Sequence, residues 1–125
     1  PPGLPVQGTV WGLVRQTRGR LSFADPCTGA PSFHLALVVE DGSAARAAHL
    51  GPAFVRDFFE LEAADVRRRL AAGGEGAAQL RELSRALTQL LAEYVGLMRV
   101  CARWRQEEGD VEVEVADLMG EAPPS

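Results

Sequence analysis

The chain has 125 residues, of which 46% are hydrophobic and 24% are charged, and its formal net charge is −4. This length and composition suit a globular domain with one core. No apolar run reaches the roughly 18 residues that a membrane-spanning helix needs. The opening PPGLPVQGTV also lacks the basic and apolar regions of a signal peptide. We therefore expect neither a spanning helix nor a secretory leader in this sequence.

We predict a single domain over residues 1–125, with a core over 5–119 and flexible ends at 1–4 and 120–125. Because the first residue is Pro rather than Met, we interpret the chain as a fragment of a larger protein. Cys27 and Cys101 are expected as reduced thiols, and a disulfide between them is the alternative. The two Cys and two His follow no ligand spacing, so we predict no metal site and no cofactor.

The first half of the chain has strand patterns separated by turn residues. Inside the first pattern, Gly8 and Gly12 indicate a bulge, strong coiling or a close backbone approach. Residues 16–32, QTRGRLSFADPCTGAPS, predict a loop. Asp41-Gly42 is a strong hairpin signal. Three strands are therefore predicted, over residues 6–15, 33–40 and 43–50.

The second half begins with helical patterns, since Pro52 suits the first turn of a helix. The glycine-rich stretch GGEG at 73–76 interrupts them. A heptad-like repeat of leucines then indicates an amphipathic helix. Helical segments are predicted over 54–59, 63–72 and 77–93. Two strands with period-two alternation follow, over 97–105 and 111–118.

The last two strands are expected to form a hairpin with EEGD as its four-residue loop. This arrangement places opposite charges on one face and apolar side chains on the other, which favours pairing. A slip of one residue would set arginines against valines. The expected register has these cross-strand neighbours: Gln106–Val111, Arg105–Glu112, Arg103–Glu114 and Trp104–Val113.

Three strands, a helical region and two further strands are the layout of the mainly β OB-fold, a five-stranded barrel. The segments PVQGTV, FHLALVVEDGSA, GPAFVRDFFELEAADV, VGLMRVCARW and DVEVEVADLM resemble one branch of that fold. This branch occurs at the C-terminus of telomere end-protection (Protection of Telomeres) proteins, in the large subunit of replication protein A, and in shieldin subunit 2. The resemblance covers residues 5–119 and is most specific in DFFELEAADV.

The sequence also departs from this branch. Its members commonly carry a zinc-binding Cys cluster or a large insertion between the early strands. Here residues 16–32 are a short segment with a single cysteine, Cys27, so neither feature is carried over.

Within the predicted barrel, we expect Phe58 to point into the bottom and Phe59 to pack under the corner against the next helix.

The resemblance implies a nuclear module that holds a protein subunit of a telomere or DNA-repair complex. An acidic balance fits such an adaptor, because the last 29 residues hold three Arg against seven acids, and an acidic surface repels phosphate. Arg67-Arg68-Arg69 could meet DNA or an acidic partner, or simply lie in solvent. The candidate protein-interface residues are Phe54, Leu61, Arg67 and Arg68.

Direct binding of single-stranded DNA, weak in the isolated domain, is the alternative function. OB-folds bind single strands with basic grooves and stacking aromatic rings, although Trp11 could equally belong to the core. The candidate residues for such a groove are Trp11, Arg15, Arg18, Arg20, Phe23, His34 and Arg46.

Catalysis is not expected. His34 and His49 are the only imidazoles, and neither has a Ser, Cys or carboxylate in a spacing typical of a triad or metal site.

Overall fold

The computed structural model describes residues 6–105 and 109–120. Residues 1–4 and 121–125 of the predicted flexible ends lie outside the described residues, as does Gln106 of the predicted hairpin. Gly120 belongs to the last strand. None of the helices within the described ranges is long and apolar enough to cross a membrane.

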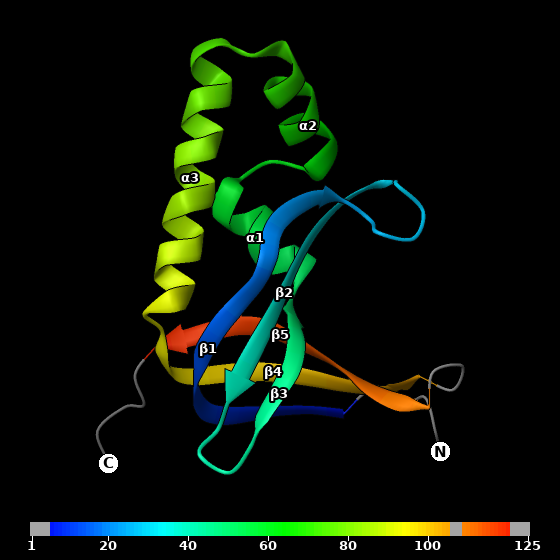
Figure 1. Ribbon diagram of the computed structural model, residues 1–125, viewed down its shortest axis with the longest axis vertical. Coiled ribbons are helices and arrows are strands. Elements are labelled where there is room, and N and C mark those ends of the chain that lie inside the picture. Colours follow the sequence, from blue (N-terminus) through cyan, green and yellow to red (C-terminus); the bar gives the residue numbers. More distant parts are fainter. Residues whose placement is uncertain (1–5, 106–108, 121–125) are drawn as a thin grey trace.

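The strands form a closed barrel in the order β1-β2-β3-β5-β4, with β4 also bonded to β1 (Figure 1). β3 and β5 are parallel, and all other neighbours are antiparallel. This topology confirms the predicted mainly β, five-stranded barrel of the OB type, with helices between the third and fourth strands. The elements are β1 (Val6–Ala24), β2 (Pro31–Glu40), β3 (Ala45–Leu50), α1 (Pro52–Phe59), α2 (Ala63–Ala72), α3 (Gly74–Ala92), β4 (Val95–Arg105) and β5 (Asp110–Gly120).

β1 is longer than predicted, so the loop predicted over residues 16–32 is wrong except at residues 25–30, which connect β1 to β2. The strand has 19 residues and pairs first with β4, up to Leu13, and then with β2. A strand shared by two neighbours must coil, and the register shifts in its second half supply the necessary bulges. The chain reverses only after Ala24, where Asp25 accepts hydrogen bonds from two backbone N–H groups at 2.8 and 3.1 Å.

The β4–β5 hairpin keeps the predicted faces but not the predicted partners. Trp104 pairs with Val111 and Arg103 with Glu112, a register shifted by two residues from the expected one. A shift of two returns every side chain to the same face, so the alternation of residue types does not separate the two registers. Gly109, with a φ of 66°, ends the loop and makes Asp110 the start of β5. The expected pairs Arg105–Glu112, Arg103–Glu114 and Trp104–Val113 are therefore wrong, and Val111, the expected partner of Gln106, pairs with Trp104.

Phe59, rather than Phe58, is the phenylalanine that points into the core, so the predicted placement of Phe58 is wrong. Phe59 is 5% exposed, and its ring stacks on that of Phe33 with 5.8 Å between centroids. Phe23 meets both of these rings edge to face. Phe58 is only partly buried and contacts the edge of Phe59. The reason is that Val55 and Phe59, four residues apart, form the buried face of α1, which turns Phe58 about 100° away from the core.

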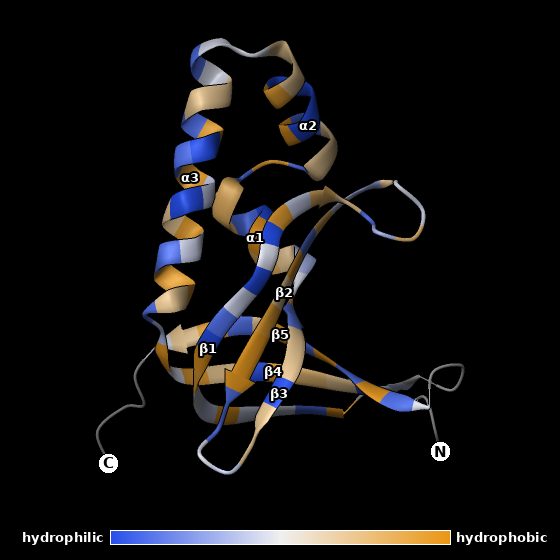
Figure 2. Cartoon of the chain, viewed as in Figure 1, coloured by the Kyte–Doolittle hydropathy of each residue, from blue (hydrophilic) through white to orange (hydrophobic). Residues whose placement is uncertain are grey.

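The helices extend from one end of the barrel (Figure 1). α2 has the predicted bounds, whereas α3 begins three residues earlier than predicted, at Gly74. Figure 2 shows apolar and polar positions alternating along α3, as expected for an amphipathic helix. Its buried side packs toward β1 and α2. The buried residues of α3 are Ala77, Leu80, Leu87 and Leu91.

Candidate functional site

An apolar cleft opens at the end of the barrel away from the helices. Its volume is about 210 Å³. Most of its lining side chains are aliphatic, and the charged residues among them are Glu40, Asp41 and Arg46. The lining residues come from all five strands and the β2–β3 turn: Val10, Val39, Glu40, Asp41, Ala44, Arg46, Met98, Val100, Ala102, Val111 and Val113.

The apolar surface continues from the cleft onto the β4–β5 hairpin. Ala102 lies opposite both Val6 and Val113, and Trp104 lies opposite Val111. Because residues two apart share a face of a strand, these side chains lie on one side of the sheet. Val6 is 69% exposed, Trp104 42% and Val111 44%. We name the cleft together with these three exposed residues the barrel-mouth surface; a contiguous apolar surface of this kind marks an interaction site.

The β2–β3 turn beside the cleft is held by Asp41. Its carboxylate accepts a hydrogen bond from the Ser43 hydroxyl at 2.7 Å and others from the backbone N–H groups of Ser43 and Ala44. These bonds, that of the Ser43 hydroxyl above all, lower the pKa of Asp41 to about 2. The carboxylate therefore stays charged at the edge of the cleft at neutral pH.

Carboxylates face an imidazole and a guanidinium on the outer side of β3, β4 and β5. The Nε2 atom of His49 lies 3.3 Å from a carboxylate oxygen of Glu114 and 3.7 Å from one of Glu112. Arg99 and Asp117 approach to 3.8 Å. Acidic groups thus balance the basic groups of this face, which leaves little positive charge for a phosphate backbone.

The outer side of β1 and β2 carries two of the predicted DNA-binding residues. Arg18 lies opposite Ala36, and Ala36 is two residues from His34 on β2, so Arg18 and His34 share a face. Arg15, on the same strand, instead binds Glu40 at 3.2 Å.

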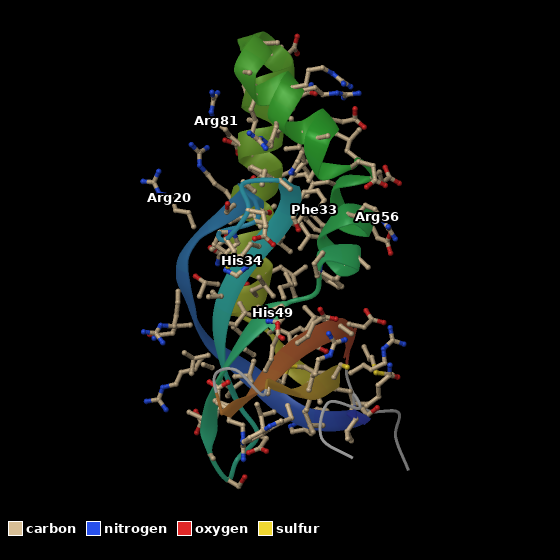
Figure 3. The ribbon with its side chains drawn as sticks, turned by 90° about the vertical axis from the view of Figure 1, so that its right-hand side faces the viewer. Arg20, Phe33, His34, His49, Arg56 and Arg81 are labelled. Carbon is tan, nitrogen blue, oxygen red and sulfur yellow. The ribbon has the colours of Figure 1, made fainter. Side chains whose placement is uncertain are left out.

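The other predicted DNA-binding residues lie elsewhere. Trp11 is 47% exposed and faces away from the barrel interior, opposite Leu97, so it is not a core residue. Phe23 belongs to the aromatic cluster around Phe59, and Arg46 lines the barrel mouth. In Figure 3, Arg20 projects from the same side of the molecule as Arg81, away from His34. The seven residues therefore do not form one surface, and their roles stay predictions.

The four predicted protein-interface residues lie on α1, α2 and the corner between them. Phe54 and Leu61 are partly buried and pack against the core. Arg67 donates a hydrogen bond to the carbonyl oxygen of Gly29 at 3.3 Å, which ties α2 to the β1–β2 turn. Arg68 bonds to Asp65 one turn earlier. Their part in binding also stays a prediction.

Apart from Arg46, which was a candidate for DNA binding, sequence reasoning missed the residues of the barrel mouth. The available signal was the position of Trp104 and Val111 at the hairpin end of the final strands. Both residues remain exposed although they alternate like core residues. Within the described ranges, no group of three or more His, Cys, Asp or Glu side chains could hold a metal ion.

No protein-family model and no curated protein sequence matches the chain. Among solved structures, the chain is similar to a chain of a replication protein A heterotrimer bound to single-stranded DNA, with a TM-score of 0.54 and 10% sequence identity. The match covers 98% of this chain but only 33% of that one. At this identity the likeness concerns the fold, and it agrees with the OB topology of the barrel.

Proposed function

We propose that the chain is a noncatalytic OB-fold module of a nuclear DNA-maintenance complex, in telomere protection or DNA repair, and that it acts mainly in protein interaction and assembly. The barrel-mouth surface carries this proposal. It combines a cleft of about 210 Å³ with Trp104 and Val111, which are each more than two-fifths exposed. Partly exposed aromatic and aliphatic side chains beside an apolar pocket are typical anchors of a protein interface.

The charge distribution supports a protein rather than a nucleic acid as the main ligand. Binding of a single strand depends on several unneutralised cations and on ring faces available for stacking. Arg15 and Arg99 each have an acidic partner, and Phe23 has its ring engaged with Phe33 and Phe59. The chain's net charge of −4 further opposes tight binding of a polyanion.

Single-stranded DNA is the second candidate ligand, bound weakly by the domain alone. The observation that favours it is the shared outer face of Arg18 on β1 and His34 on β2; β2 is one of the strands whose face OB-folds use for oligonucleotides. The similar replication protein A chain comes from a complex bound to single-stranded DNA. A fluorescence titration of labelled oligothymidine at increasing salt measures this activity directly.

The main proposal is tested by affinity purification of the tagged chain from nuclear extract, with identification of the bound proteins. Val111→Glu places a charge in the barrel-mouth surface, and Val95→Glu is the matched control, because Val95 is a similarly exposed valine (52%) on another part of the barrel. We expect subunits of a DNA-maintenance complex to co-purify with the wild type and with Val95→Glu, and to be lost with Val111→Glu.

A contrary result is equally clear. If the chain retains no protein partner but binds oligothymidine at submicromolar concentration with a steep salt dependence, the domain is a DNA-binding module. If the same partners remain bound to Val111→Glu, the barrel mouth is not the interface.

A further inference from the structure

A second groove lies outside the barrel, between the second half of β1 and α3. Its volume is about 780 Å³, within the range of pockets that hold sizeable ligands. Its apolar floor is formed by Leu21 and Phe23 of β1 and Leu70 of α2, which pack against the core. The α3 side adds Ala92 and the polar side chains of Ser84, Thr88 and Gln89. The stretch of α3 that forms one wall, residues 81–92, is about 16 Å long at 1.5 Å per residue.

Arginines line both walls of this groove. Arg20 stands on the β1 side, and Arg81 and Arg85 stand on α3, four residues apart and therefore on one face of the helix. Figure 3 shows Arg20 and Arg81 projecting on the same side of the molecule. Arg85 bonds to Glu82 on its own helix. Within the described part of the chain, neither Arg20 nor Arg81 has an ion-pair partner, and the groove lining includes no carboxylate.

We propose that this β1–α3 groove binds an acidic, amphipathic segment of a partner protein. The arginines flank an apolar floor, so a segment with alternating acidic and apolar side chains satisfies both parts of the groove. Guanidinium groups form paired hydrogen bonds with carboxylates, and the floor buries the apolar side chains. The inference deepens the proposed protein-interaction function by naming a partner class, at a site separate from the barrel mouth.

A single-stranded nucleic acid would bind this groove more weakly than an acidic peptide. It would meet the same arginines, but its bases need ring faces on which to stack. Phe23 is the aromatic residue in the floor, and its ring is already packed edge to face against Phe33 and Phe59 at about 6 Å. The charge and the apolar floor together therefore favour a peptide.

The test is fluorescence anisotropy with the 125-residue chain and three labelled probes. The first is a 12-residue peptide that alternates Glu or Asp with Leu or Phe; the second has every acid replaced by Gln; the third is a 20-nucleotide oligothymidine. The variant Arg20→Glu/Arg81→Glu reverses charge on both walls. Arg56→Glu is the matched control, because Arg56 is an exposed arginine of α1 on another side of the molecule (Figure 3). Circular dichroism melting verifies that each variant is folded.

We expect micromolar binding of the acidic peptide, at least tenfold weaker binding of the Gln peptide, and at least tenfold weaker binding by the double variant, with Arg56→Glu unchanged. Amide NMR shifts on adding the peptide should concentrate at residues 19–23 and 81–92. Absence of acidic-peptide binding at 100 μM protein, equal binding by the double variant, or tighter binding of oligothymidine in the same groove each overturns the inference. Val111→Glu should bind the peptide normally, so failure at this groove and failure at the barrel mouth are read separately.

Discussion

Truncation of Phe59 should destabilise the fold far more than truncation of its neighbour Phe58. Phe59 is 5% exposed and contacts Phe33, Phe23 and Phe58 with ring centroids 5.7–6.0 Å apart. Removal of a buried phenylalanine costs about 3–5 kcal/mol of unfolding free energy, including the cavity that remains. Phe58 is partly buried and touches one ring, so Phe58→Ala should cost about 1–2 kcal/mol.

The variant Phe59→Leu separates the loss of burial from the loss of ring contacts. Leucine keeps most of the buried apolar area, whereas each aromatic pair contributes about 0.5–1.5 kcal/mol beyond burial. We therefore expect Phe59→Leu to cost about 2 kcal/mol, between the wild type and Phe59→Ala. Urea denaturation followed by far-ultraviolet circular dichroism measures all three free energies, provided that the slope against urea is unchanged. Equal losses for Phe58→Ala and Phe59→Ala, or a loss below about 1 kcal/mol for Phe59→Ala, would refute the assignment of Phe59 to the core.

Two further predictions concern the backbone and its turns. Gly12→Ala should lower the free energy of unfolding by about 1–3 kcal/mol, because an added Cβ would lie 2.4 Å from the Glu40 carbonyl oxygen. Gly8→Ala is the control in the same urea titration and should be nearly neutral, since nothing lies within 4 Å of a Cβ at that position. The pKa of Asp41 should be about 2 by NMR titration of its carboxyl carbon, and Ser43→Ala should raise it, because the Ser43 hydroxyl is the main cause of the depression. Since this pKa lies below the ordinary 3.8, the turn's contribution to stability is present above about pH 4 and is lost as the pH falls toward 2. A Ser43→Ala protein whose Asp41 titrates unchanged would contradict that account.

Patterns that depend on neighbouring residues were predictable from the sequence. The bounds of α2 and the order of the strands follow from periodicity and from breakers such as the glycines at 73–76 and Asp41-Gly42, which act within a few residues. Of the alternatives that the glycines of the first strand indicated, a close backbone approach is present at Gly12, where an added Cβ would lie 2.4 Å from the carbonyl oxygen of Glu40, but not at Gly8. These features need no knowledge of distant contacts.

The candidate surfaces were less predictable, because they depend on which side of each strand faces a cavity. Arg20 and Arg81 are 61 positions apart in the chain, and only the packing of α3 beside β1 brings them to one groove. Arg18 and Arg20 belong to the same predicted loop, yet in the strand that replaces this loop Arg20 lines the β1–α3 groove and Arg18 does not. Two arginines that are close in sequence were therefore assigned to one basic site, although only Arg20 lines the groove.

The sequence by itself determined the element order and hence the barrel topology, because hydrophobic periodicity and turn chemistry are local. Only the tertiary structure decided the hairpin register, the length of β1 and which of two adjacent phenylalanines lies in the core. A two-residue register shift preserves the alternation of faces. The second half of β1 contains polar residues and Gly19, which are typical of a loop, yet it pairs with β2 as a strand. The rotation of α1 is set by what Val55 and Phe59 pack against, which is a property of the assembled core.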